Sequence, residues 1–218
     1  MSNYFSKVPN LDYVSRLPDA NISDYIPVKN LFKKGKLRED IFQDLTVFTK
    51  WKIEGDDRPD NVAFKAYGDS NLDWLVLASN NIINIQTEWP LTQYNYDVYL
   101  LDKYGTYDKL NDTHHHETLE IKDSRGVTLL KAGLRVPSDF SFKYSDNNNA
   151  FSANPVKEVT NLEYENEIQD QRRNIWILKD RYINIALDDL ENIMTYKKGS
   201  SQYVTESLKR GDNIRLFQ

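Results

Sequence analysis

Three consecutive histidines, His114, His115 and His116, are the most obvious candidates for chemistry in this chain. In a strand, His114 and His116 would share a face and could bind a metal ion together. A complete site needs three or four ligands, and the neighbouring carboxylates Asp112 and Glu117 do not stand at a diagnostic spacing. An internal triplet is more often an exposed loop or the start of a strand. We therefore predict no metal site and no cofactor.

Paired carboxylates are the second candidate for chemistry, at Asp56–Asp57 and Asp188–Asp189. Such pairs act as acid and base only in a shielded cleft that separates their pKa values. Asp57 is better placed to cap a helix, and Asp188–Asp189 falls on the polar face of one. The sequence has no nucleophile elbow, no phosphate-binding loop and 0 cysteines. We therefore predict that the chain is not an enzyme.

The tryptophans offer a third kind of chemistry, stacking on sugar rings. Trp74 lies in an apolar run expected to be helical, and Trp176 lies in an expected strand. Both are therefore predicted to be core residues. Trp89, which precedes Pro90, is predicted to be a surface anchor.

The composition limits the class of protein. The 218 residues suffice for one medium domain with an insertion or for two small domains. The net charge is −5, from 28 basic and 33 acidic residues, which disfavours general binding to nucleic acid or anionic membrane. No run of about 18 apolar residues and no apolar signal region occurs. We expect a soluble protein, made in the cytoplasm, that does not contact membranes.

Two basic runs stand out from this acidic balance, Lys33 to Arg38 and the polar tail from residue 198. They are interpreted as solvated faces or as salt links to an acidic partner, with contact to nucleic acid as the minor option.

Residues 1–45 are predicted to form an extended arm, because Pro9, Pro18 and Pro27 disfavour helix. The arm is rich in aromatic residues, unlike a disordered tail, so it is expected to become ordered against partners. The 12% aromatic content of the whole chain suits interfaces in the same way. The predicted interface residues are Tyr4, Phe5, Tyr13, Tyr25, Phe32 and Trp89.

The rest of the chain alternates between the two kinds of element. Strands are predicted at 46–53 and 172–179, and helices at 57–68 and 70–81, with stops at Gly68 and Asn80–Asn81. Further predictions are a short helix over 94–104, strands within 114–145, a loop at 146–155, a helix over 160–172 that starts with a capping box of Thr160 and Glu163, and an amphipathic helix capped by Asp180.

The order strand, helix, helix, strand resembles the LysM-type module, with residues 82–171 inserted before the last strand. A wider stretch, RPDNVAFKAYGDSNLDWLVLASNNIINIQTEWPL, resembles the baseplate wedge subunit of T-even-like contractile-tailed phages that contains a LysM-like fold. The residues that carry this resemblance are Arg58, Pro59, Asp60, Ala63, Tyr67, Gly68, Asp69, Leu72, Trp74, Leu75, Asn80 and Trp89. The N-terminal MSNYF and residues 159–183, which include Trp176, also resemble the family.

This resemblance implies an α+β fold with a LysM-like core, a small β-rich insertion, an extended N-terminal arm and a C-terminal helix. The expected divisions are an arm over 1–45, a core over 46–100 with 172–197, an insertion over 101–171 and a polar tail over 198–218. It also implies a structural protein of the virion that clamps adjacent wedges together and to the central hub during tail assembly. Its partners would be other wedge subunits, sheath-initiator proteins and hub proteins, in several copies in a six-fold assembly. The alternative is a LysM-type glycan-binding module of a cell-wall-associated protein.

Overall fold

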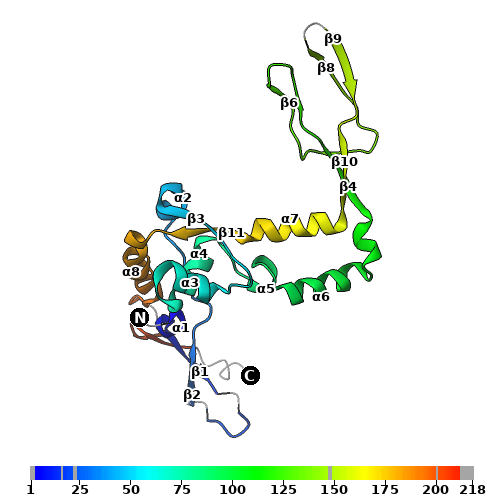
Figure 1. Cartoon of the computed structure of the whole chain (residues 1–218). Coiled ribbons are helices and arrows are strands. Elements are labelled where there is room, and N and C mark those ends of the chain that lie inside the picture. Colours follow the sequence, from blue (N-terminus) through cyan, green and yellow to red (C-terminus); the bar gives the residue numbers. More distant parts are fainter. Residues whose placement is uncertain (1–2, 16, 22–23, 147–148, 200, 212–218) are drawn as a thin grey trace. The chain divides into compact units, whose positions relative to one another are not determined.

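A computed structural model of the chain describes residues 3–15, 17–21, 24–146, 149–199 and 201–211. The fold is of mixed α+β type, in agreement with the predicted class, and consists of helices with several small sheets. The chain forms two compact units, one from residues 1–89 with 174–218 (unit 1) and one from residues 90–173 (unit 2) (Figure 1). The finer divisions expected from the sequence stay predictions.

The centre of unit 1 is a two-stranded antiparallel sheet. Strand β3 (Phe48–Lys52) pairs with β11 (Asn174–Leu178), in a register that runs from Phe48 opposite Leu178 to Lys52 opposite Asn174. Between them in sequence come helices α3 (Pro59–Tyr67) and α4 (Asp73–Ser79), joined by the 3₁₀ turn η2 (Ser70–Leu72). The strand–helix–helix–strand order predicted from the sequence is therefore present, and the two strands that close it are 122 positions apart, from Lys52 to Asn174.

The helix ends of this unit differ in detail from the prediction. The N-cap residue of α3 is Arg58, whose side chain makes no capping hydrogen bond. Asp57, the predicted cap, instead accepts a hydrogen bond of 2.5 Å from Lys65 Nζ. Asp69, and not Ser70, accepts the backbone N–H of Asn71 at the next turn. The stop at Gly68 is confirmed, since its φ of 72° places it in the left-handed region that glycine adopts without strain.

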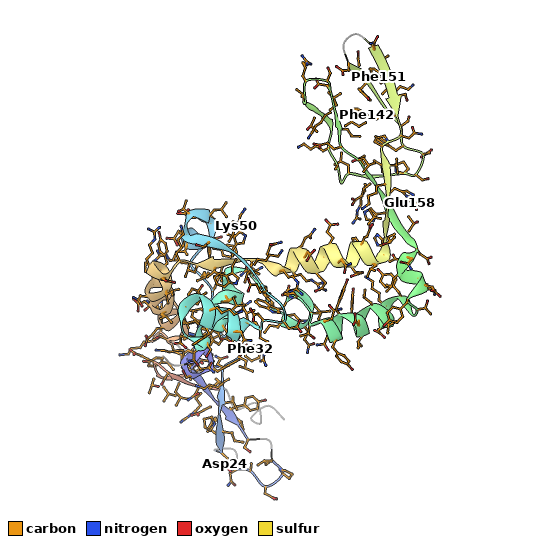
Figure 2. The ribbon with its side chains drawn as sticks, viewed as in Figure 1. Asp24, Phe32, Lys50, Phe142, Phe151 and Glu158 are labelled. Carbon is orange, nitrogen blue, oxygen red and sulfur yellow. The ribbon has the colours of Figure 1, made fainter. Side chains whose placement is uncertain are left out.

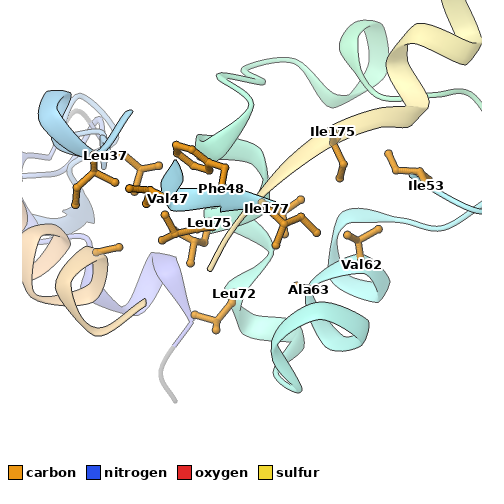
Figure 3. Close-up of a cluster of buried hydrophobic side chains, with 14 of the residues drawn as sticks. Leu37, Val47, Phe48, Ile53, Val62, Ala63, Leu72, Leu75, Ile175 and Ile177 are labelled. Carbon is orange, nitrogen blue, oxygen red and sulfur yellow. The ribbon is translucent and has the colours of Figure 1, made fainter. Parts of the chain in front are cut away.

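The apolar core of unit 1 is built from α3, α4 and the two paired strands (Figure 3). Alternate residues of β11, Ile175 and Ile177, face Val62 and Leu75 of the helices, as expected for a sheet with one buried face. The fully buried members include Ile53, Val62, Leu75, Val76 and Leu178.

The segment expected to be an extended arm is more regular than predicted. It contains α1 (Tyr4–Lys7), β1 (Asn10–Val14), β2 (Tyr25–Lys29), α2 (Glu39–Gln43) and the turn η1 (Leu45–Val47). The segment expected to be a polar tail likewise contains β12 (Tyr203–Thr205) and β13 (Leu208–Arg210). The sheet order is β12-β13-β1-β2, so the two chain ends stabilise each other through backbone hydrogen bonds. Pro27 fits this sheet because β2 is an edge strand.

Unit 1 is completed by three further elements. They are α5 (Ile85–Glu88), the turn η4 (Asp180–Tyr182) and α8 (Ile183–Met194). Helix α8 has the predicted amphipathic pattern and buries Leu190 and Met194 against Val8 and Tyr4. Its N-cap is Tyr182, so the predicted cap at Asp180 is wrong by one 3₁₀ turn.

Unit 2 contains two long helices, α6 (Gln93–Tyr104) and α7 (Asn161–Arg173), with the turn η3 (Asp108–Asn111) after α6. The capping box of Thr160 and Glu163 at the start of α7 is confirmed by both reciprocal hydrogen bonds. Strand β4 (Thr113–Thr118) pairs with β10 (Val156–Thr160) and with β7 (Arg135–Val136).

Two hairpins lie between β4 and β10 in the sequence. One pairs β5 (Ile121–Lys122) with β6 (Thr128–Leu130), and the other pairs β8 (Phe142–Asp146) with β9 (Asn149–Ala153). Strand β9 occupies the segment predicted to be a loop. The prediction fails because Phe151 lies directly opposite Tyr144, and such aromatic cross-strand pairs stabilise a strand of low intrinsic propensity. Within the described ranges, no helix is long and apolar enough to cross a membrane.

Candidate protein interface

The residues predicted to form an interface separate into exposed and buried groups. Phe32 is 96% exposed, and Phe5 and Leu31 are also exposed (Figure 2). Exposing large apolar side chains is unfavourable in water, so they are candidates for contact with another protein.

Tyr4 has a different position, because it fixes the N-terminal segment to unit 1. Its hydroxyl accepts a hydrogen bond of 2.8 Å from Gly35 N, and its ring lies 5.8 Å from the ring of Trp74. Gly35 has no room for a side chain, since a Cβ there would lie 2.6 Å from Leu190 Cδ1. Tyr4 therefore holds the segment around residue 35 against α8 and leaves Phe5, next to it, exposed.

An apolar groove borders this contact. It has a volume of about 820 Å³ and is lined by side chains that include Phe5, Phe42, Trp74, Leu77 and Ile83. Phe5, Phe42 and Ile83 are exposed large apolar residues. The groove is therefore suited to an apolar side chain from another protein, as in the pockets that receive anchor residues at interfaces.

Tyr13 and Tyr25 lie on the strands β1 and β2. Tyr13 is 37% exposed, and the ring of Tyr25 lies 4.9 Å from the guanidinium carbon of Arg210. Neither is as free as Phe32, and their role in an interface stays a prediction.

Trp89 was predicted to be a surface anchor, but the structure shows that its side chain is buried. It is 5% exposed and belongs to the core of unit 1. Its indole N–H donates a hydrogen bond of 2.9 Å to the backbone carbonyl of Asp57. The short helix α5, just before Trp89, returns the chain to the core. The position of Trp89 next to Pro90 in the sequence gives no sign of this.

Asn80 explains why an asparagine stands at the end of α4. Its Nδ2 donates to the carbonyls of Val76 and Trp176, each at 2.8 Å, and its Oδ1 accepts the backbone N–H of Trp176 at 2.7 Å. The amide thus completes the hydrogen bonding of the helix end and ties it to β11. Only a side chain with both a donor and an acceptor can do this.

Most of the other residues of the predicted signature pack on the core of unit 1 or form the start of α3. Trp74 and Trp176 are partly buried and pack against the core of unit 1, as expected. Arg58 is exposed and lies 3.4 Å from Asp60, while Pro59 opens α3 and is buried. Tyr67 packs on the same core, and burial raises the pKa of its hydroxyl.

A second exposed aromatic surface lies on unit 2 and was not among the predicted interface residues. Phe142, Tyr144 and Phe151 stack along one face of the β8–β9 hairpin, with ring centroids 5.9 Å and 5.4 Å apart (Figure 2). We refer to these three residues as the hairpin surface. Phe151 is 45% exposed. The alternation in FSFKYSD, with aromatic residues at positions 140, 142 and 144, was the signal that could have revealed it.

The histidine cluster lies on β4, as predicted for the start of a strand. The ring of His114 stacks on Tyr164 with centroids 4.0 Å apart, and its Nδ1 lies 2.8 Å from His115 Nδ1. His115 Nε2 lies 2.8 Å from a carboxylate oxygen of Glu117. Burial, His115 and Arg135 together lower the pKa of His114. Among the described residues, no three His, Asp or Glu side chains form a group that could hold a metal ion.

Comparison with known proteins adds the identity of the family. A family model described as base plate wedge protein 53 matches residues 4–123, which are 120 of the 218 residues. The match includes the N-terminal segment, α3, α4 and α6, and it ends within unit 2. No curated protein sequence matches the chain. Residues 159–183 lie beyond the family match, so their resemblance stays a prediction. Because the model spans more than half of the sequence, the chain belongs to the base plate wedge protein 53 family.

Proposed function

We propose that this protein is a structural subunit of a phage tail baseplate that clamps adjacent wedges together and to the central hub during tail assembly. The family places it among baseplate wedge proteins. The observation that carries the clamping role is that large apolar side chains stay exposed on both units, at Phe32 of unit 1 and at Phe151 of unit 2. A protein that joins two neighbours needs at least two such surfaces.

The strand–helix–helix–strand core of unit 1 is proposed to be LysM-like. The antiparallel pairing of β3 with β11 and the two intervening helices support this assignment. The likeness concerns the fold and gives no support to sugar binding, since Trp89 is buried and Trp74 and Trp176 pack against the core. In this proposal the core serves as a rigid support for the exposed residues.

The proposal is tested by mixing the purified protein with the other wedge subunits of the same phage and separating the mixture on a sizing column. A stoichiometric complex is expected. A chain that stays monomeric in every combination would contradict the proposal.

A matched pair of variants locates the contact. Phe32→Ala should weaken the complex while leaving the melting temperature unchanged, because Phe32 makes almost no contact within its own chain. Phe64→Ala serves as the control, since Phe64 is also an exposed phenylalanine, on α3, outside the predicted arm. Equal loss in both variants would mean that the arm has no special part in assembly.

A further inference from the structure

The two basic runs of the sequence, Lys33 to Arg38 and the tail from residue 198, come together at the C-terminal end of α8, beside Lys197. A pocket of about 660 Å³ there is lined by five basic side chains, those of Lys33, Lys36, Arg38, Lys197 and Lys209. Its acidic side chains are Glu39 and Asp189, so the lining carries a net charge of +3, from five cations and two anions. A positive pocket is unexpected in a chain with a net charge of −5.

Local structure explains how two of these lysines are placed. Lys33 Nζ donates to the last carbonyls of α8, those of Ile193, Met194 and Thr195, at 2.7, 3.2 and 2.9 Å. A cation is favourable there because these carbonyls have no partner in the helix and carry its negative end. Lys33 Nζ and Lys209 Nζ also lie 4.7 Å and 5.1 Å from the centre of the buried Tyr196 ring.

The positive charge of the pocket is only partly compensated. Arg38 lies 2.7 Å from Asp40 and 3.9 Å from Asp189, whereas Lys36, Lys197 and Lys209 have no carboxylate within 4 Å among the residues described. Burial and the nearby charges of Lys209 and Lys197 lower the pKa of Lys33, as expected where cations crowd together. An anion that entered the pocket would relieve this repulsion.

The remaining lining indicates what kind of anion fits. Leu37, Ile193 and Tyr196 supply apolar surface, so the pocket suits side chains as well as charges. Asp189 and Glu39 also line the pocket, and their carboxylates can accept a hydrogen bond from a donor such as a backbone N–H. A polyphosphate backbone offers no such donor and would be repelled by Asp189 and Glu39, whereas a peptide offers both carboxylates and N–H groups.

We propose that this pocket docks an acidic segment of another baseplate protein, with its carboxylates on Lys36, Lys197 and Lys209 and a backbone N–H on Asp189. The inference deepens the proposed function, on which the identification of the partner as a baseplate protein rests. The proposed docking is a charged contact, which salt weakens, in addition to the contacts proposed for the exposed apolar side chains.

The test uses the full chain in which two exposed lysines are reversed, Lys36→Glu with Lys197→Glu. The matched control is Lys52→Glu with Lys198→Glu, which changes the net charge equally at exposed side chains that line neither this pocket nor the apolar groove. Both variants are compared with the unchanged chain by circular dichroism and melting temperature, to establish that they fold. Binding to each purified wedge subunit is then titrated at low and at high salt.

The pocket variant should bind its partner subunit at least about tenfold more weakly at low salt than the control variant, and its remaining binding should depend less on salt. Equal binding by both folded variants would overturn the inference and leave the proposed function intact. Failure of the unchanged chain to bind any wedge subunit would contradict the proposed function itself.

A single-stranded DNA oligonucleotide is titrated in parallel. Binding of the oligonucleotide as tight as that of a wedge subunit, with the same loss in the pocket variant, would overturn the choice of a protein segment.

Discussion

Units 1 and 2 are stabilised by different interactions. Unit 1 has a cluster of 15 buried apolar residues drawn from both sheet strands, both central helices, α2 and α8. Unit 2 has a cluster of three, Tyr96, Leu100 and Leu110, next to a carboxylate that is 1% exposed, Glu165. We expect the stability of unit 2 to depend more strongly on pH than that of the apolar core of unit 1, because the ionisable Glu165 is buried beside the cluster of unit 2.

The difference continues into the hairpins of unit 2, which depend on polar contacts. Asp123 accepts the N–H groups of Arg125 and Val127 within the β5–β6 turn. Asp146 accepts both the N–H and the hydroxyl of Ser124, which links the two hairpins. Two-stranded hairpins with so little buried apolar area are marginally stable alone. From this comparison we expect unit 1 to be a self-sufficient body and the hairpins of unit 2 to gain stability from a partner.

The largest effect is expected in the core of unit 1. Leu75→Ala removes a fully buried side chain and should lower the free energy of unfolding by about 2–5 kcal/mol. Leu45→Ala, at an exposed leucine, should change it by less than about 0.5 kcal/mol. All four tryptophans lie in unit 1, so tryptophan fluorescence during urea denaturation reports this unit alone. A small effect of Leu75→Ala would show that the cluster does not stabilise unit 1.

A smaller and pH-dependent effect is expected at Glu165 of unit 2. The carboxylate accepts hydrogen bonds from Lys103 Nζ at 2.5 Å, Tyr104 at 2.9 Å and Tyr99 at 3.3 Å. Burial disfavours the charged form, but these donors outweigh burial and hold the pKa of Glu165 below its usual value. A lowered pKa in the folded state means that the carboxylate stabilises unit 2 fully above the unfolded pKa, about 4.3, and that this contribution is lost as the pH falls through the folded value.

Glu165→Gln should therefore destabilise unit 2 by about 1–3 kcal/mol at pH 7. The difference from the unchanged chain should shrink as the pH falls through the lowered pKa of the folded state, because the carboxyl group is protonated in both states only below that pKa. Hydrogen exchange of residues 90–173 measures this, with tryptophan fluorescence of unit 1 as the internal control. The control is Glu167→Gln, which alters an exposed carboxylate of the same helix. A pH-independent difference would contradict the role given to the charge.

These two cores also differ in how far the sequence predicted them. The strand, helix, helix, strand order of unit 1 followed from local signals, such as Gly68 and the apolar spacing of α3 and α4, because each signal lies within its own element. The partnership of β1 with β13 could not be predicted, since it joins residues about 200 positions apart through backbone groups that leave no pattern in the side chains. Trp89 was misplaced for a similar reason, because its partner Asp57 lies 32 positions away.

The exposed residues show the same difference between features that lie within one segment and features that join distant segments. Phe32 could be predicted to be exposed from its polar and proline-rich surroundings, and its exposure agrees with the interface prediction, although contact with a partner remains to be tested. The basic pocket could not be predicted as one site, because neither basic run indicates that the end of α8 brings them together.

The smallest effect on the free protein, and the most informative for the comparison, is expected at the hairpin surface. Phe151→Ser removes one aromatic partner of Tyr144 and should cost the β8–β9 hairpin about 0.2–1 kcal/mol, since Phe151 is already half in water. Tryptophan fluorescence of unit 1 should not change. Assembly with the other wedge subunits should nevertheless weaken, because the same ring would be buried there.

Ser152→Ala, at the neighbouring exposed position on the opposite face of β9, is the control and should affect neither measurement. Hydrogen exchange of residues 119–155 in the free protein and in the assembled wedge separates the two contributions of the aromatic surface. Protection that rises on assembly in the unchanged chain and not in Phe151→Ser would show that the partner supplies the stability that the hairpin lacks. If Phe151→Ser instead unfolds the whole of unit 2 in the free protein, the hairpin is part of a self-sufficient core and the contrast between the two units does not hold.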